Sequence, residues 1–278
     1  MEPIIRQTAV AGMFYPDNPG ELQTTIDHYL REAKASRKAV HSQRDTQKDQ
    51  QEIQTPKALI VPHAGYIYSG PVAASAYARL EASRDIIRRV ILLGPSHRVA
   101  FTGMAVSSAD YFATPLGSIP IDKQAIHEIV SLTQVQLIDQ AHSQEHSLEV
   151  QLPFLQRVLD DFTLVPIVVG DADPESVGTV LETLWGGPET LIVISSDLSH
   201  YHSYVTAQQM DRRTSNAIES MHPDDIHYDD ACGRNPVNGL LVAAKKHGLH
   251  AKTVDLRNSG DTAGPKDQVV GYGAYVFG

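Results

Sequence analysis

Short runs of apolar residues alternate with longer segments in which apolar positions show helix-like spacing. Four such runs follow residue 56, at Ala58–Val61, Val90–Leu93, Leu164–Val169 and Leu191–Ile194. Near-continuous apolar runs separated by helical segments are typical of strands whose sheet is covered on both faces. The pattern therefore predicts an α/β protein, an α/β/α sandwich around a largely parallel or mixed central sheet.

Helix-like segments occupy the intervals between the runs. Apolar residues recur with helical spacing in Val72–Leu80, Leu148–Leu159 and Glu175–Leu184, and an earlier helix begins near Pro19. Val269–Phe277 predicts one last strand. The sequence has no internal repeat and no second composition regime, so we expect residues 1–278 to form a single domain.

One polar segment interrupts this pattern. Residues 36–56 are rich in Gln, Lys and Asp and follow neither the helical nor the strand period. Nothing before this segment could form a core alone, so we do not interpret it as a linker between domains. We expect a mobile insertion on the surface of the domain.

Composition limits the partners and the compartment. The 278 residues include 33 acidic and 23 basic side chains, a formal net charge of −10. This balance opposes non-specific nucleic-acid binding, which depends on Lys and Arg neutralising phosphates. No apolar stretch is long enough to span a bilayer, and the N-terminus lacks the features of a signal peptide. We therefore expect a cytoplasmic protein with neither a nucleic-acid nor a membrane partner, which the single cysteine also fits.

Three histidines come soon after predicted strands. His63, His97 and His200 follow the first, second and fourth apolar runs, each in a loop-forming context of Gly, Pro, Ser or Asp. Ligands of open α/β sheets bind at the carboxyl ends of the strands, where the loops converge. One such histidine is usually structural, but three suit either a metal site or acid–base chemistry.

The single cysteine lies just ahead of a predicted helix. Cys232 precedes the apolar segment Val237–Ala244. A free cysteine is often a small buried hydrophobic residue. At a helix N-terminus, however, the helix dipole and the exposed N–H groups favour the thiolate, which can bind a metal or act as a nucleophile.

A second histidine cluster allows two interpretations. His142-x-x-Glu145-His146 matches the inverted zinc-peptidase motif, with Glu219 as a possible third ligand. Ser143 resembles a helix cap and Pro153 limits the following helix, so the local sequence opposes that arrangement. We favour roles in which these residues contact a bound ligand or support metal ligands.

Several motifs together resemble the Memo family. They occur in the family's order and span nearly the whole chain, whereas residues 36–56 contain no family motif. The central motifs are Pro62-His63-Ala64-Gly65-Tyr66, Gly94-Pro95-Ser96-His97, Ala141-His142-x-x-Glu145-His146-Ser147-Leu148-Glu149, Ser195-Ser196-Asp197-x-x-His200-Tyr201 and Cys232-Gly233-x-x-Pro236.

The resemblance implies a fold similar to that of the class III non-haem iron extradiol dioxygenases. It implies that His63 and His97 are the two histidine ligands of a metal. Cys232 falls where the dioxygenases have their carboxylate ligand. His200 matches the acid–base histidine, and Asp197 is its neighbour.

A cysteine in place of the carboxylate changes the expected chemistry. A thiolate is softer than a carboxylate and favours Fe(II), Cu(I) or zinc, and it is itself oxidisable. The resulting hypothesis is a redox protein that binds Fe(II) and holds a small molecule or peptide in its cleft. Copper and zinc are the alternative metals. The alternative is a metal- or peptide-binding protein without turnover. In either case, we expect His142, Glu145, His146 and Tyr66 to contact the ligand or support the metal ligands.

Overall fold

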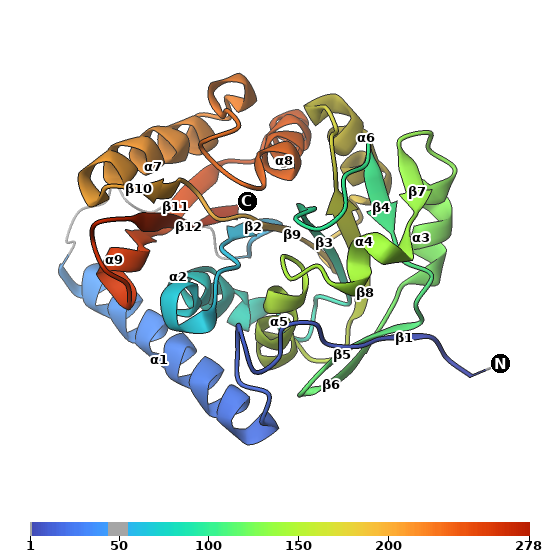
Figure 1. Cartoon of the computed structure of the whole chain (residues 1–278), viewed down its shortest axis with the longest axis horizontal. Coiled ribbons are helices and arrows are strands. Elements are labelled where there is room, and N and C mark those ends of the chain that lie inside the picture. Colours follow the sequence, from blue (N-terminus) through green and yellow to red (C-terminus); the bar gives the residue numbers. More distant parts are fainter. Residues whose placement is uncertain (1, 44–54) are drawn as a thin grey trace.

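The computed structural model of the chain describes residues 2–43 and 55–278. A nine-stranded mixed sheet runs through the molecule between two layers of helices (Figure 1). Its strands follow the order β10-β12-β2-β9-β3-β8-β4-β7, and β11 pairs with β12. The expected α/β architecture is thus confirmed.

The strands within the described residues are β1 (Ile5–Arg6), β2 (Ala58–Val61), β3 (Arg89–Pro95), β4 (Met104–Val106), β5 (Tyr111–Thr114), β6 (Gly117–Pro120), β7 (Val135–Leu137), β8 (Thr163–Val169), β9 (Thr190–Ser195), β10 (His200–His202), β11 (Ala251–Asn258) and β12 (Val269–Phe277). The α-helices are α1 (Pro19–Gln43), α2 (Tyr66–Tyr77), α3 (Lys123–Val130), α4 (Asp139–Ser143), α5 (Leu152–Val158), α6 (Pro174–Leu184), α7 (Tyr204–Glu219), α8 (Arg234–Lys246) and α9 (Ser259–Thr262). Short 3₁₀ turns occupy Ala78–Ser83, Glu149–Gln151 and Pro223–Asp225.

The four apolar runs form the centre of the sheet. Strands β2, β9, β3 and β8 are mutually parallel, so their carboxyl ends share one edge. Every residue of β2 and β9 is buried, as expected for strands covered on both faces. Antiparallel strands β12 and β4 flank this core next to β2 and β8, which makes the sheet mixed.

The two helical layers cover opposite faces of the sheet (Figure 1). Helix α2 packs on β2, β11 and β12, with α1 and α5 against it. Helix α8 packs on β3 and β9, with α6 alongside, while α7 contacts β11 and β12. Within residues 2–43 and 55–278, the structure contains no helix that is both long and apolar enough to cross a membrane.

The amino-terminal segment crosses the body of the domain. Strand β1 pairs with β5 in a separate three-stranded sheet, β1-β5-β6. Beyond it, the buried carboxylate of Glu149 accepts hydrogen bonds from the N–H groups of Ala9 and Val10, at 2.8 and 3.0 Å, and forms an ion pair with Arg6. Arg6 also donates to the carbonyl of Glu145 at 2.7 Å, so this segment is tied to the loop that carries Glu145.

The polar segment differs in part from its expected form. Helix α1 continues through Gln43, so residues 36–43 are helical. Their Lys, Arg, Ala and Gln residues are good helix formers by intrinsic propensity, which does not depend on an apolar stripe. The rest of the expected insertion, residues 44–54, lies outside the described residues.

Candidate metal centre

Three parallel strands deliver side chains to one edge of the sheet. His63, His97 and Asp197 each lie two residues beyond the end of a strand, β2, β3 and β9 respectively. Because these strands are parallel neighbours, equal offsets bring the three residues together at the carboxyl edge. The sheet thus assembles the residues that the sequence places after separate apolar runs.

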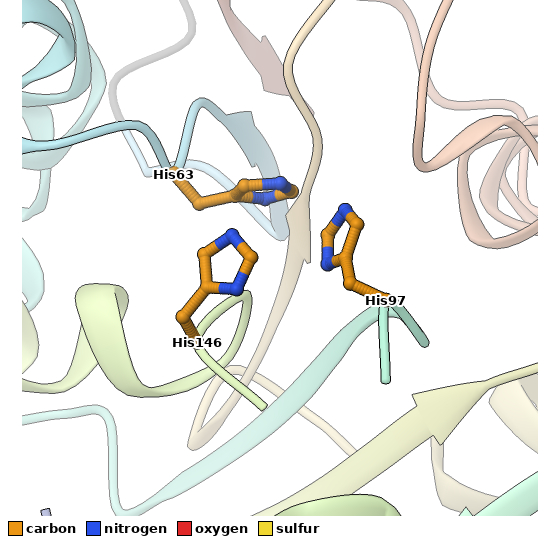
Figure 2. A group of neighbouring side chains, drawn as sticks. All are labelled: His63, His97 and His146. Atoms are coloured by element: carbon orange, nitrogen blue, oxygen red, sulfur yellow. The ribbon is translucent and has the colours of Figure 1, made fainter. Parts of the chain in front are cut away.

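Three histidines form a compact group at this edge. His63, His97 and His146 each offer one ring nitrogen, and these nitrogen atoms lie within 4.8 Å of one another (Figure 2). The ring centroids of His97 and His146 are 4.6 Å apart, and His63 lies 5.3 and 5.4 Å from them. His146 comes from the loop after α4 and not from a strand end.

The tautomer of His63 follows from its hydrogen bonds. His63 Nδ1 lies 2.9 Å from Ser195 Oγ, whose own hydrogen is donated to the Ser147 carbonyl at 2.6 Å. Ser195 Oγ must therefore accept from His63, which places the proton on Nδ1. The lone pair then lies on Nε2, as a metal ligand requires.

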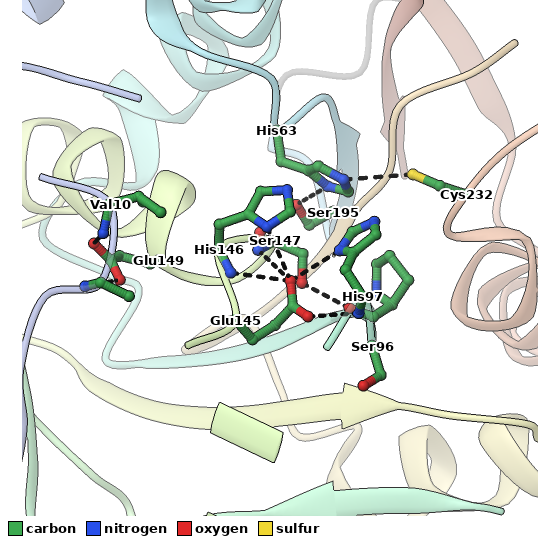
Figure 3. Close-up of polar contacts among 12 residues, drawn as sticks. Val10, His63, Ser96, His97, Glu145, His146, Ser147, Glu149, Ser195 and Cys232 are labelled. Carbon is green, nitrogen blue, oxygen red and sulfur yellow. Dashed lines mark hydrogen bonds and ion pairs between the residues drawn. The ribbon is translucent and has the colours of Figure 1, made fainter. Parts of the chain in front are cut away.

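Glu145 orients His97 in the same way. Its carboxylate accepts from the His97 backbone N–H at 2.6 Å and pairs with Nδ1 of the His97 ring at 2.9 Å (Figure 3). The same carboxylate accepts from the N–H groups of His146 and Ser147, each at 2.9 Å. Burial opposes ionisation of Glu145, but its interactions with the His97 ring and its hydrogen bonds from the N–H groups of His97 and Ser147 outweigh burial and lower its pKa to about 2. An ionised Glu145 keeps the proton on His97 Nδ1 and leaves Nε2 free.

His146 has a polar ring atom without a partner. Its Nδ1 is buried and forms no hydrogen bond with the residues described, although Glu145 lies 3.3 Å away. Burial lowers the pKa of His146, and the nearby His97 lowers it further. Burial also holds the pKa of His63 well below its usual value. Imidazole nitrogens with a free lone pair are common metal ligands, so the donor set of this group suits a metal ion.

His200 and Asp197 lie beside this group. His200 Nδ1 donates to the Leu198 carbonyl at 2.8 Å, which leaves Nε2 as the nitrogen available for proton exchange. Asp197 Oδ1 accepts from the His63 backbone N–H at 2.7 Å, and burial raises its pKa. The Leu198 carbonyl, and not Asp197, is thus the group that orients the His200 ring.

Cys232 also lies next to His63. Its Sγ is 3.4 Å from His63 Nε2 (Figure 3). The same sulfur is 3.6 Å from the Asp197 carbonyl oxygen. Burial raises the pKa of the thiol to about 12, and the Asp197 carboxylate adds to this effect. The expected lowering of the pKa by the helix N-terminus is therefore wrong. The N–H of Gly233, at the start of α8, donates to Ser196 Oγ at 2.9 Å, and its lowering effect on the pKa of the thiol is smaller than the effect of burial.

The inverted zinc-peptidase arrangement is not formed. Helix α4 ends at Ser143, so His142 and His146 do not share a helical face. His142 Nε2 bonds to the Ala105 carbonyl at 3.0 Å, and the ring packs edge-on against Phe112. Glu219, the possible third ligand, accepts instead from the backbone of Thr253 at 2.8 Å.

A cavity of about 530 Å³ opens above the histidine group. Tyr68, Phe14 and Tyr272 line it together with His200, whereas Tyr66 does not. Tyr66 is buried and donates to the Val150 carbonyl at 2.8 Å, so it supports the packing below the cavity. Side chains two positions apart on a helix point to nearly opposite sides. This spacing in the sequence indicates that Tyr68 and Tyr66 cannot both face the cavity.

Comparison with known proteins identifies the family of this chain. The family model of the Memo-like proteins matches residues 6–276, and the chain belongs to the Memo family. It is 36% identical to a MEMO1 family protein of Metallosphaera sedula and 36% identical to one of Aquifex aeolicus, covering 98% of this chain and 99% of each relative. A solved structure of an uncharacterised protein from Escherichia coli K12 matches with a TM-score of 0.51 at 14% identity, over 79% of this chain and 98% of that one. At that identity the likeness concerns the fold alone.

Proposed function

We propose that this chain is a metal-dependent redox protein whose metal ion is Fe(II). His63, His97 and His146 would hold the ion, and Cys232 would lie beside it. The observation that carries the proposal is that one ring nitrogen from each of the three histidines lies within 4.8 Å of the other two. The second ring nitrogens of His63 and His97 are hydrogen-bonded to Ser195 and Glu145. Such outer partners orient histidines for metal binding.

His146 replaces Cys232 as the third ligand in this proposal for a geometric reason. Within the part of the chain that the structure describes, the converging group contains three histidines and no thiol. Cys232 Sγ lies 3.4 Å from His63 Nε2 but is not a member of the group whose ligand atoms all lie within 4.8 Å of one another. We therefore assign Cys232 to the edge of the centre. There its sulfur would adjust the electronic properties of the bound ion, or would become a ligand when a different metal ion binds.

His200 would move protons next to the ion. Its Nδ1 is engaged by Leu198, and its ring lines the cavity above the histidine group. A bound Fe(II) supplies Lewis acidity and one-electron chemistry, and copper or zinc would compete for the same nitrogens. The aromatic and apolar walls of the cavity suit a small organic ligand.

Metal titration without oxygen tests the ligand assignment. The wild-type protein should bind about one equivalent of Fe(II). His63→Ala, His97→Ala and His146→Ala should each lower the affinity by more than about 100-fold, because loss of an outer partner alone costs roughly 10–100-fold. Cys232→Ala, His200→Ala and the exposed control His222→Ala should keep full stoichiometry. Unchanged binding in His63→Ala and His97→Ala would refute the centre.

A non-catalytic binding protein is the second candidate, and one observation favours it. The resemblance implies a carboxylate ligand at the position of Cys232, whose Sγ lies 3.4 Å from His63 Nε2, and an oxidisable thiol there suits binding without oxygen chemistry. A screen of small metabolites with the iron-loaded protein separates the two functions. Substrate-dependent oxygen uptake that His200→Ala abolishes supports the enzyme. Ligand binding without uptake in any condition supports the binding protein.

A further inference from the structure

A second cavity, of about 640 Å³, adjoins the metal centre. His97, His200 and Tyr201 line both this cavity and the one above the histidines, so the two spaces meet along a common wall. Cys232 and Arg234 line the second cavity alone. A ligand that reaches the metal centre can therefore extend toward the amino end of α8.

Arg234 has no counterion within residues 2–43 and 55–278. It is half-buried, and its guanidinium lies 5.7 Å from the centre of the Tyr228 ring. Four other buried or half-buried arginines pair with carboxylates: Arg6 with Glu149, Arg89 with Asp122, Arg157 with Asp27, and Arg257 with Asp255. A half-buried guanidinium without such a partner is set up to receive an anion from outside the chain.

The backbone at the common wall is strained. Tyr201 adopts a φ of 60°, a left-handed conformation that is unfavourable for a residue other than glycine. Its side chain remains 70% exposed, so burial of the ring does not offset this cost. Strain of this kind clusters at ligand sites. Here it holds an exposed aromatic ring next to His200, with the two ring centroids 5.7 Å apart.

The charges around the second cavity favour a monoanion. Asp171 and Asp229 also line it, and Arg234 is the one side chain there with a permanent positive charge among the described residues. A single guanidinium matches a carboxylate with two parallel hydrogen bonds, whereas a phosphate dianion would meet two acidic groups and only one cation.

We propose that Arg234 binds the carboxylate of a small ligand whose other end reaches the metal ion. The ligand class is a metal-chelating carboxylic acid that spans the wall formed by His97, His200 and Tyr201. This inference rests on the proposed metal centre, and it adds a specificity-determining residue to it.

Hydroxamates provide the test, because they chelate metals at one end and can carry a carboxylate at the other. The probes are the monohydroxamates of succinic, glutaric and adipic acid, each compared with the uncharged acyl hydroxamate of equal length. Binding to protein loaded with one equivalent of Zn(II), which is redox-inert, is measured by calorimetry. We expect at least one carboxylated probe to bind 10-fold or more tightly than its uncharged counterpart.

Substitutions then test whether Arg234 causes the tighter binding of the carboxylated probes. Arg234→Gln should abolish it and leave the uncharged probes unaffected, and Arg234→Lys should keep only part of it, because a lysine lacks the two-pronged fork. Arg98→Gln is the matched control: this exposed arginine follows His97 in the sequence but does not line the cavity. It should preserve the full advantage.

Each other outcome overturns a specific statement. The role of Arg234 is overturned if no carboxylated probe, whatever its length, binds more tightly than its uncharged counterpart. It is also overturned if Arg234→Gln and Arg98→Gln reduce this difference in affinity equally. A phosphonate probe that binds more tightly than the matching carboxylate overturns the choice of a monoanion. Failure of Zn(II) and Fe(II) to load overturns the metal centre, and with it the inference that depends on it.

Discussion

Glu145 binds His97 at two points, accepting a hydrogen bond from its backbone N–H at 2.6 Å and pairing with its ring Nδ1 at 2.9 Å. The two bonds fix both the position of the loop and the rotation of the ring. We expect Glu145→Gln to lower metal affinity by roughly 10–100-fold, the usual cost of losing an outer partner of a histidine ligand. Calorimetric titration with Fe(II) or Zn(II) measures the change.

A second carboxylate–histidine pair provides the control for that substitution. Glu182 lies 3.0 Å from His247 on the surface, far from the strand edge that carries the centre. Glu182→Gln should bind metal like the wild type. If both variants lose affinity equally, the effect of Glu145 is one of general charge and not of orientation.

Ser195 should matter both for the metal and for stability. Its hydroxyl accepts from His63 Nδ1 and from the Gln151 side chain, and it donates to the Ser147 carbonyl. Ser195→Ala leaves these buried groups unpaired, so we expect a loss of about 1–3 kcal/mol in the free energy of unfolding. Metal affinity should fall about 10-fold, because His63 loses the acceptor that fixes its tautomer. Ser131→Ala, at an exposed helix end, should change neither denaturant midpoint nor affinity.

The buried pair of Arg6 and Glu149 should stabilise the fold more than a surface pair. Glu149→Ala leaves the Arg6 guanidinium buried without its carboxylate and should cost about 3–5 kcal/mol in urea unfolding. Replacing both residues by Met should recover only the part of this loss that comes from the uncompensated charge, because the N–H groups of Ala9 and Val10 still lose their acceptor. The exposed pair of Arg84 and Asp160 is the comparison, and Asp160→Ala should cost less than about 1 kcal/mol. A similar small loss for Glu149→Ala would show that the buried pair is dispensable.

Asp211 should make stability depend on pH. Burial raises the pKa of this carboxyl group to about 6, although the Ser199 N–H donates to it at 3.0 Å. The folded state therefore binds a proton more tightly than the unfolded state, and this contribution to stability is lost as the pH rises from about 4 to about 6. Asp211→Asn should leave stability unchanged near pH 4 and raise it by about 1–3 kcal/mol at pH 7.5.

Guanidinium unfolding at the two pH values measures the effect of Asp211→Asn. The exposed Asp161→Asn serves as the control and should show no such difference. Equal stability of Asp211→Asn and the wild type at pH 7.5 would mean that the folded protein tolerates this buried charge without cost.

The sequence by itself determined the strands and the residues that follow them. The runs that became β2, β3, β8 and β9 are apolar throughout, and a strand buried on both faces requires this. Their parallel order then brought His63 and His97 to one edge. This much is local pattern combined with one general rule about sheets, so it could be predicted.

Tertiary structure alone decided which residues complete the centre. His146 joins His63 and His97 because Arg6 and Glu145 hold its loop through hydrogen bonds between residues 48 to 139 positions apart. The environment of Cys232 depended in the same way on residues distant in sequence. The helix N-terminus alone favours a thiolate, but burial against Asp197 raises the pKa of the thiol. Desolvation and long-range hydrogen bonds exist only once the chain has folded, and no local pattern encodes them.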